Sequence, residues 1–198
     1  MMQIEELKYA INEVSLNDDQ SYFEKIYSTY YNRLFRLSLS IVKREEIAEE
    51  VYDDVMMNIW NKRKELNQIN NFTVYLYVSV KNTSLRYLNR SNKISNVNID
   101  EITTDIQDLT PTAHEQLIAL EFIDKVNTTI AQLPPQCKLV FKLVKEDGLK
   151  YKEVAEILDI SIKNVEYHMG NALKKISITI ASDKNAATPN SIKTILSN

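Results

Sequence analysis

Residues that interrupt helices are nearly absent from this chain, which has only two glycines and four prolines among 198 residues. Glycine and proline destabilise the interior of a helix by about 1 and about 3 kcal/mol relative to alanine. Long stretches without either residue therefore favour helices, and apolar residues recur within these stretches at intervals of three and four. We expect an all-α fold.

The helical stretches fall into two groups. The residues between the groups are rich in Asn, Ser, Thr and Asp, which indicates a flexible acidic linker. We therefore expect two small helical domains. The expected parts are an N-terminal amphipathic lead at 1–19, a first domain at 20–92, the linker at 93–112, a second domain at 113–181 and a disordered tail at 182–198.

Residues 151–175 indicate two helices joined by a tight turn. Asp159 falls in the turn, where aspartate tolerates a left-handed backbone better than most residues. Ser161 is a suitable N-cap for the second helix, whereas Lys150 stands where a Ser or Thr would cap the first. The predicted buried stripe of the second helix is Val165, Met169, Ala172 and Ile176. This pattern is typical of a helix-turn-helix, whose second helix lies in the DNA major groove.

The opposite face of this second helix is polar. Its side chains are of the types that hydrogen-bond base edges and phosphates. The candidate DNA-contacting residues are Lys163, Asn164, Glu166, Tyr167, His168, Asn171, Lys174 and Lys175. A polar helix face can also be merely solvated, so this segment alone leaves both interpretations open.

Charge is segregated along the chain, although the net charge is only −3. Residues 71–93 contain four basic residues and no acidic one, whereas residues 99–124 contain seven acidic residues and no Lys or Arg. Such segregation indicates that different segments meet different partners, and a basic segment is expected where nucleic acid binds.

Signatures of catalysis and of metal binding are missing. Cys137 is the only cysteine, so no disulfide can form within the chain, which fits a reducing cytoplasm. His114 and His168 lie far apart in the sequence, and there is no Gly-rich phosphate loop. No apolar run is long enough for a membrane span, and the N-terminus lacks signal-peptide architecture. We predict a cytoplasmic protein that is not an enzyme and uses no metal, cofactor or small-molecule substrate.

Several segments carry a resemblance to a known family. Residues 48–60, AEEVYDDVMMNIW, are similar to a helix with the pattern A-E-D-x-x-Q-E-x-F-x-x-x-W. Residues 72–90 are similar to F-x-x-W-L-x-x-x-x-x-N-x-x-x-D-x-x-R, with Tyr75 in place of Trp and Arg86 in place of Asp. Residues 133–137 and 148–155 are similar to L-P-x-x-x-R and G-x-S-x-x-E-I-A. In this order, the segments resemble the extracytoplasmic-function (ECF) subfamily of bacterial sigma-70 sigma factors, and the sequence style is Bacteroidetes-like.

The resemblance implies sigma region 2 in the first domain and sigma region 4 in the second. It implies binding to core RNA polymerase, at the β′ clamp and the β flap, and promoter-specific initiation of transcription. The helix at 48–60 would dock on the basic clamp through an acidic face. The candidate polymerase-binding residues are Glu49, Glu50, Asp53 and Asp54.

The resemblance also implies that the helix at 72–90 engages the −10 element, while the helix-turn-helix reads the −35 element. Holding an unstacked base requires polar groups, aromatic rings and cations. The candidate −10 residues are Asn71, Lys81, Asn82, Arg86 and Arg90. Asn82 matches the family's base-pocket Asn, although it could instead pack between helices. Tyr75 is expected in the core rather than as a stacking platform.

The resemblance also implies a membrane-bound anti-sigma factor as a further partner. The linker resembles the family segment that threads into the channels of the polymerase. Two other functions remain open. The first is a stand-alone helix-turn-helix regulator with a helical sensor domain at 20–90. The basic, acid-free segment at 71–93 argues against that function. The second and poorer alternative is an adaptor that binds only protein.

Overall fold

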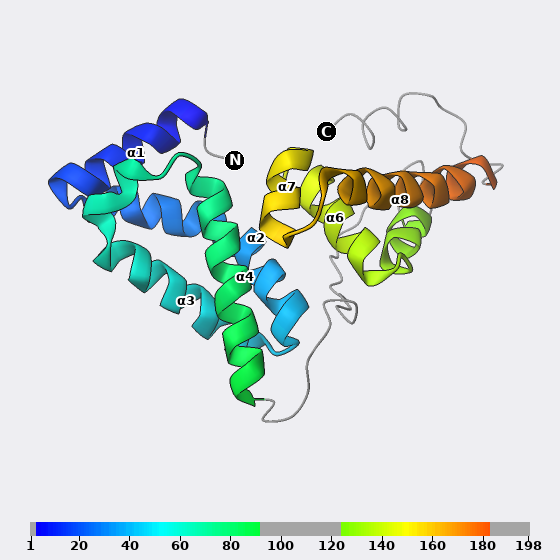
Figure 1. Cartoon of the computed structure of the whole chain (residues 1–198), viewed down its shortest axis with the longest axis horizontal. Coiled ribbons are helices and arrows are strands. Elements are labelled where there is room, and N and C mark those ends of the chain that lie inside the picture. Colours follow the sequence, from blue (N-terminus) through cyan, green and yellow to red (C-terminus); the bar gives the residue numbers. More distant parts are fainter. Residues whose placement is uncertain (1–2, 92–123, 183–198) are drawn as a thin grey trace, which may run out of the picture. The chain divides into compact units, whose positions relative to one another are not determined.

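The computed structural model describes residues 3–91 and 124–182, which form helices joined by short turns (Figure 1). Within these residues there is no β-strand, and none of the helices is both long and apolar enough to cross a bilayer. The chain divides into two compact units, Met1–Asn96 and Val97–Asn198. The predicted all-α, two-domain fold is confirmed. The predicted linker at 93–112 and the predicted tail beyond Ser182 lie outside the described residues.

The first unit is a helical bundle. It begins with α1 (Ile4–Asn17), α2 (Gln20–Val42) and α3 (Glu45–Asn61), then passes through a 3-10 helix, η1 (Arg63–Gln68), into α4 (Phe72–Ser91). The helices α2, α3 and α4 all pack against one another, and α1 packs against η1 and α2. Figure 1 shows α1 in dark blue at one end of this bundle and α4 in green along its side.

The core of the first unit takes one stripe from each of the three bundle helices. Its buried side chains include Ile26, Tyr30 and Leu34 of α2, Val51, Tyr52 and Val55 of α3, and Leu76, Tyr77 and Val80 of α4. Two of the buried tyrosines keep hydrogen-bond partners, since Tyr30 Oη lies 2.7 Å from Thr73 Oγ1 and Tyr52 donates to the Tyr27 carbonyl at 2.6 Å. Burial of these aromatic rings therefore leaves no hydroxyl without a partner.

The N-terminal segment, expected as an amphipathic lead at 1–19, contains a helix with one buried face. It forms α1, which buries Ala10, Ile11 and Val14 against the rest of the unit. Arg63 and Lys64 of η1 both form salt bridges with Asp18, directly after α1. The apolar stripe of α1 is therefore buried against η1 and α2, and the domain boundary expected at residue 19 stays a prediction.

Residues with cap geometry stand at both ends of α2. Asp19 caps α2 by accepting hydrogen bonds from the backbone N–H groups of Ser21 and Tyr22, at 2.8 and 3.3 Å. Lys43 ends α2 in the left-handed conformation, with φ of 60°. This turn reverses the chain into α3, so the acidic residues of α3 are carried by a helix that packs against α2.

The second unit contains the helix-turn-helix. Residues 124–131 are helical, and α6 (Pro135–Lys145), α7 (Tyr151–Leu158) and α8 (Ile162–Ser182) follow. Both α6 and α7 pack against α8. The predicted stripe of α8 is confirmed, because Val165, Met169, Ala172 and Ile176 are all buried. This stripe fixes which face of α8 points away from the unit.

The turn between α7 and α8 has the predicted chemistry. Asp159 adopts the left-handed conformation, with φ of 57°, and Ser161 Oγ accepts a hydrogen bond from the Asn164 N–H at 3.2 Å. At the start of α7, the Glu153 carboxylate accepts from the Lys150 N–H at 2.8 Å. This is the reciprocal half of a capping box, so α7 has a cap interaction although Lys150 replaces the expected Ser or Thr.

Candidate functional site

The four acidic candidates of α3 are exposed and form two pairs, each spaced by four residues. Tyr27 and Tyr31 of α2 donate hydrogen bonds to Asp53 and Glu49, at 2.6 and 3.2 Å. At the other edge of this acidic face, Tyr87 of α4 donates to Asp54 at 2.7 Å and to Glu50 at 3.2 Å. The acidic face is therefore flanked by tyrosines from two neighbouring helices.

These contacts keep the tyrosines as hydrogen-bond donors. Burial, followed by the hydrogen bond to Asp53, raises the pKa of Tyr27. For Tyr87, the hydrogen bond to Asp54 is the main cause of a raised pKa. Each phenol stays protonated at neutral pH, so it orients a carboxylate without neutralising its charge. The face therefore presents negative charge at the surface of the first unit.

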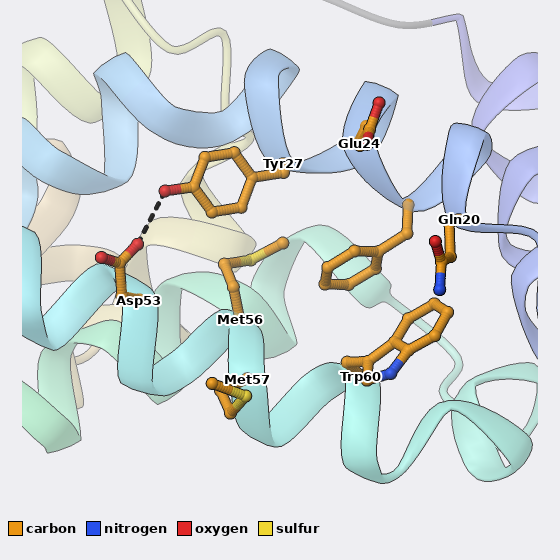
Figure 2. A pocket seen from close by; sticks show the side chains of 8 residues that line it. Gln20, Glu24, Tyr27, Asp53, Met56, Met57 and Trp60 are labelled. Carbon is orange, nitrogen blue, oxygen red and sulfur yellow. Dashed lines mark hydrogen bonds between the residues drawn. The ribbon is translucent and has the colours of Figure 1, made fainter.

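An apolar groove of about 430 Å³ runs beside this acidic face, between α2 and α3. Figure 2 shows Tyr27 reaching across it to Asp53, with Met56, Met57 and Trp60 following along α3. Phe23 also lines the groove and packs on Trp60, with ring centroids 5.0 Å apart. Met57 remains 63% exposed. A groove of this kind suits an apolar side chain of a partner, with the carboxylate of Asp53 at its edge.

The outer face of α4 gathers most of the candidate −10 residues, and we define it as Asn71, Tyr75, Asn82, Arg86 and Arg90. Their intervals from Asn71 are 4, 11, 15 and 19 residues, which places them on one side of a helix. All five are exposed in the structure. The remaining candidate, Lys81, is half-buried at the flank of this face.

Tyr75 corrects an expectation, because it was predicted in the core and is 37% exposed instead. The neighbouring positions Val74 and Leu76 take the buried sites on α4. An aromatic ring counts as apolar in a helical pattern, which explains the error. Its spacing from Asn71 and Asn82, by four and seven residues, was the available signal for the outer face.

Two members of the α4 outer face also have local structural roles. Asn71 Oδ1 accepts a hydrogen bond from the Val74 N–H at 3.1 Å, so Asn71 acts as an N-cap for α4. Arg86 Nη2 donates to Thr83 Oγ1 at 2.8 Å, which holds the guanidinium near the helix surface. Asn82, by contrast, is exposed and does not pack between helices.

The candidates on α8 separate into an outer and a flanking group. Lys163, Asn164, Glu166, Tyr167, Lys174 and Lys175 are exposed, and Tyr167 is 65% exposed. His168 and Asn171 are only half-buried. The structure therefore presents a row of polar and aromatic side chains that starts at the N-terminus of α8, where a recognition helix contacts base edges.

His168 is directed toward α6 rather than along the outer row. Its Nδ1 lies 3.3 Å from the sulfur of Cys137, and burial lowers the pKa of the imidazole. The ring also packs edge-on to Tyr167, with centroids 5.5 Å apart. His168 therefore supports the helix and its neighbouring tyrosine, and we leave it out of the base-contacting set proposed below.

No cluster of three or more His, Cys, Asp or Glu side chains suited to a metal ion occurs in residues 3–91 or 124–182. The prominent features of these residues are instead helix faces, one acidic on α3 and two of mixed polar character on α4 and α8.

Comparisons with known proteins match both units to one family. The sigma-70 region 2 family model matches residues 26–94, and the sigma-70 region 4 model matches residues 123–176. An ECF RNA polymerase sigma-E factor of Haemophilus influenzae is 23% identical over 166 residues, which cover 80% of this chain and 87% of that protein.

Among the solved structures compared, the first described here has a similar fold. The structure of CnrH in complex with the cytosolic domain of CnrY has a TM-score of 0.52 at 19% identity, and the match covers 89% of this chain and 98% of that chain. The sigma factor RpoE of Bartonella quintana, solved with the anti-sigma factor NepR, has a TM-score of 0.49 at 17% identity, with 82% and 98% covered. With two sigma regions matched in order over more than half of its length, the chain belongs to the sigma-70 family of RNA polymerase sigma factors and to its ECF subfamily.

Proposed function

We propose that three surfaces of this ECF sigma factor have separate functions. The acidic face of α3 binds core RNA polymerase. The α4 outer face holds the −10 element, and the outer row of α8 reads the −35 element. The observation that carries this proposal is the α4 outer face. It places an exposed tyrosine, an exposed asparagine and two arginines on one side of a helix that has no acidic residue.

The polymerase-binding surface rests on charge and shape together. Glu49, Glu50, Asp53 and Asp54 complement a basic partner such as the β′ clamp, and complementary charge speeds association and fixes register. The apolar groove beside Asp53 supplies the burial that exposed ion pairs lack. In the second unit, we assign the β flap as the polymerase contact on the basis of the family alone.

The −10 surface combines the three chemistries that an unstacked base requires. Tyr75 offers a ring for stacking, Asn82 offers an amide for a base edge, and Arg86 and Arg90 hold phosphates. Lys81, at the flank, adds charge near the backbone. Asn71 contributes mainly by fixing the start of α4.

The −35 surface is the row at the N-terminal part of α8. Lys163, Asn164 and Glu166 are placed to contact base edges, since Asn pairs with adenine and Glu accepts from cytosine N4. Tyr167 adds an apolar ring that can contact a thymine methyl group. Asn171, Lys174 and Lys175 lie further along α8 and contact phosphates, which position the helix without specifying sequence.

The regulatory partner proposed here is a membrane-bound anti-sigma factor. CnrH, which has a similar fold, was solved in complex with the cytosolic domain of CnrY. A protein of this kind would cover the polymerase-binding surface on α3 and hold the chain inactive. The site of action is the cytoplasm, where core polymerase works, and the chain itself contributes no catalytic group.

The test is reconstitution with core RNA polymerase. The purified chain should co-elute with the core enzyme and direct initiation from a defined subset of a promoter library, while the chain alone binds those promoters weakly. A chain that does not associate with polymerase, and that binds palindromic DNA tightly as a dimer, would overturn the proposal in favour of a stand-alone regulator.

A further inference from the structure

Gly170 occupies an unexpected position in the exposed face of α8. It is one of only two glycines in the chain, and it lies within a helix of 21 residues. Glycine destabilises a helix interior relative to alanine, because it loses more backbone freedom on folding. A helix that otherwise avoids glycine thus carries one on its outer face.

Nothing within the described part of the chain requires this glycine. A Cβ atom built at Gly170 meets no atom within 4 Å, so the space there is open. Its backbone is helical, in contrast to Gly148, whose φ of 72° lies in the left-handed region that favours glycine. Neither packing nor backbone conformation therefore accounts for Gly170.

The neighbours of Gly170 belong to the proposed DNA-binding row. Glu166 and Tyr167 precede it by four and three residues, and Lys174 follows it by four. At these intervals all four residues share one face of the helix, and all four are exposed. The missing side chain leaves a gap between Tyr167 and Lys174, where the helix backbone is open to a partner.

The fit of a helix in the major groove is tight enough for one side chain to matter. An α-helix with its side chains is about 10–12 Å across, and the major groove is about 12 Å wide. A side chain that faces a wall of the groove therefore limits how deeply the helix inserts. Gly170 lies one turn beyond the base-contacting residues and one turn before Lys174, where the groove wall and its phosphates are expected.

We propose that Gly170 is the point of closest contact between α8 and the −35 duplex, where the absent side chain lets the sugar–phosphate wall approach the helix backbone. This inference rests on the proposed −35 function of α8. It makes Gly170 a positioning residue for promoter recognition, because the insertion depth that it allows brings Glu166 and Tyr167 within reach of the bases.

The test compares Gly170→Ala and Gly170→Leu with the wild-type full chain, each assembled with core polymerase. Gly170→Ala should raise the melting temperature of the chain by roughly 2–5 °C, since alanine favours the helix. It should nevertheless weaken holoenzyme binding to a promoter fragment selected by the wild type, by roughly ten-fold. Gly170→Leu should weaken binding further. Both losses should vanish on a fragment whose −35 element is scrambled.

Ser177→Ala is the matched control, because Ser177 is exposed on the same helix seven residues later, where DNA contact is not expected. The melting temperature of Ser177→Ala should stay close to that of the wild type, with any fall much smaller than the rise expected for Gly170→Ala. Its promoter binding should equal that of the wild type.

The double variant Lys163→Ala with Glu166→Ala tests the proposed −35 function itself. If this pair loses −35 dependence while Gly170→Ala binds normally, the inference about Gly170 is wrong and the −35 function stands. If none of the α8 variants alters −35 dependence, the proposed −35 function fails.

Discussion

The imidazole Nδ1 of His168 on α8 lies 3.3 Å from the thiol sulfur of Cys137 on α6. This contact links the proposed recognition helix to the helix that precedes the helix-turn-helix. Burial raises the pKa of the Cys137 thiol, although Lys175 acts in the opposite direction. Cys137 is therefore a small buried residue whose thiol contacts the imidazole of His168, and this contact holds α8 against α6.

A pH dependence follows from the environment of His168. Burial lowers its pKa below the ordinary 6.5, so the unfolded chain binds a proton more readily than the folded chain between these two values. The His168 contribution to stability is therefore complete above pH 6.5 and is lost as the pH falls toward the folded-state pKa. The thermal stability of wild type and His168→Gln should be compared from about pH 8 to about pH 5. The wild type should lose stability relative to the variant as the pH falls, whereas a constant difference would contradict the assignment.

The acidic pairs on α3 give a second prediction. Glu49→Gln with Asp53→Asn, and Glu50→Gln with Asp54→Asn, remove charge while they keep size and hydrogen-bond acceptors. Each double variant should bind core polymerase roughly ten-fold more weakly, because charge complementarity is lost at the interface.

Glu5→Gln with Glu6→Gln is the matched control for these variants. Glu5 and Glu6 lie exposed in the first turn of α1, and the change in net charge is identical. Affinity should be close to the wild-type value in this variant, as measured by competition for a labelled core enzyme. An equal loss in all three variants would mean that the overall charge, rather than the α3 face, governs binding.

The elements of the fold could be predicted from local sequence patterns. The scarcity of glycine and proline, the Asp19 and Ser161 caps and the stripe from Val165 to Ile176 all act within one or two helical turns. The tyrosine–carboxylate contacts could not be predicted in this way, because Tyr87 and Asp54 are 33 residues apart and meet only after α3 and α4 pack. The Bacteroidetes-like source stays a prediction.

Residue type alone is a poor guide to the position of two side chains. An aromatic ring counts as apolar, so Tyr75 is expected in the core and that expectation is wrong, whereas the DNA-binding role of His168 stays a prediction beside its contact with Cys137. For both residues, the position along the helix determines whether the side chain points toward the core or toward solvent. His168 lies three residues after Val165 and four before Ala172, which brings it beside the buried stripe. The same intervals were present in the sequence, so helix position was a better guide than residue type.

Tyr75 gives a third prediction, on promoter opening. Stacking of a base on an aromatic ring contributes about 1–3 kcal/mol, so Tyr75→Ala should weaken holoenzyme binding to a fragment with an unpaired −10 strand by a corresponding factor. Tyr75→Phe should retain most of the affinity, because the ring remains. Tyr9→Ala is the control, since Tyr9 is also an exposed tyrosine but lies on α1, away from the α4 outer face. A loss of similar size at Tyr9 would remove the case for a specific stacking site.

Gly148 provides the last prediction, on the stability of the second unit. Its φ is 72°, and the turn that it forms lets the Leu149 N–H donate to the Leu143 carbonyl at 3.0 Å. Because a Cβ atom there would meet no neighbour, Gly148→Ala isolates the cost of the left-handed backbone, about 1 kcal/mol. Gly148→Asn should cost less, since asparagine tolerates this conformation better than alanine. Denaturant unfolding of the three proteins measures the order, which should be wild type, then Asn, then Ala. An alanine variant as stable as the wild type would show that the turn adopts another conformation in solution.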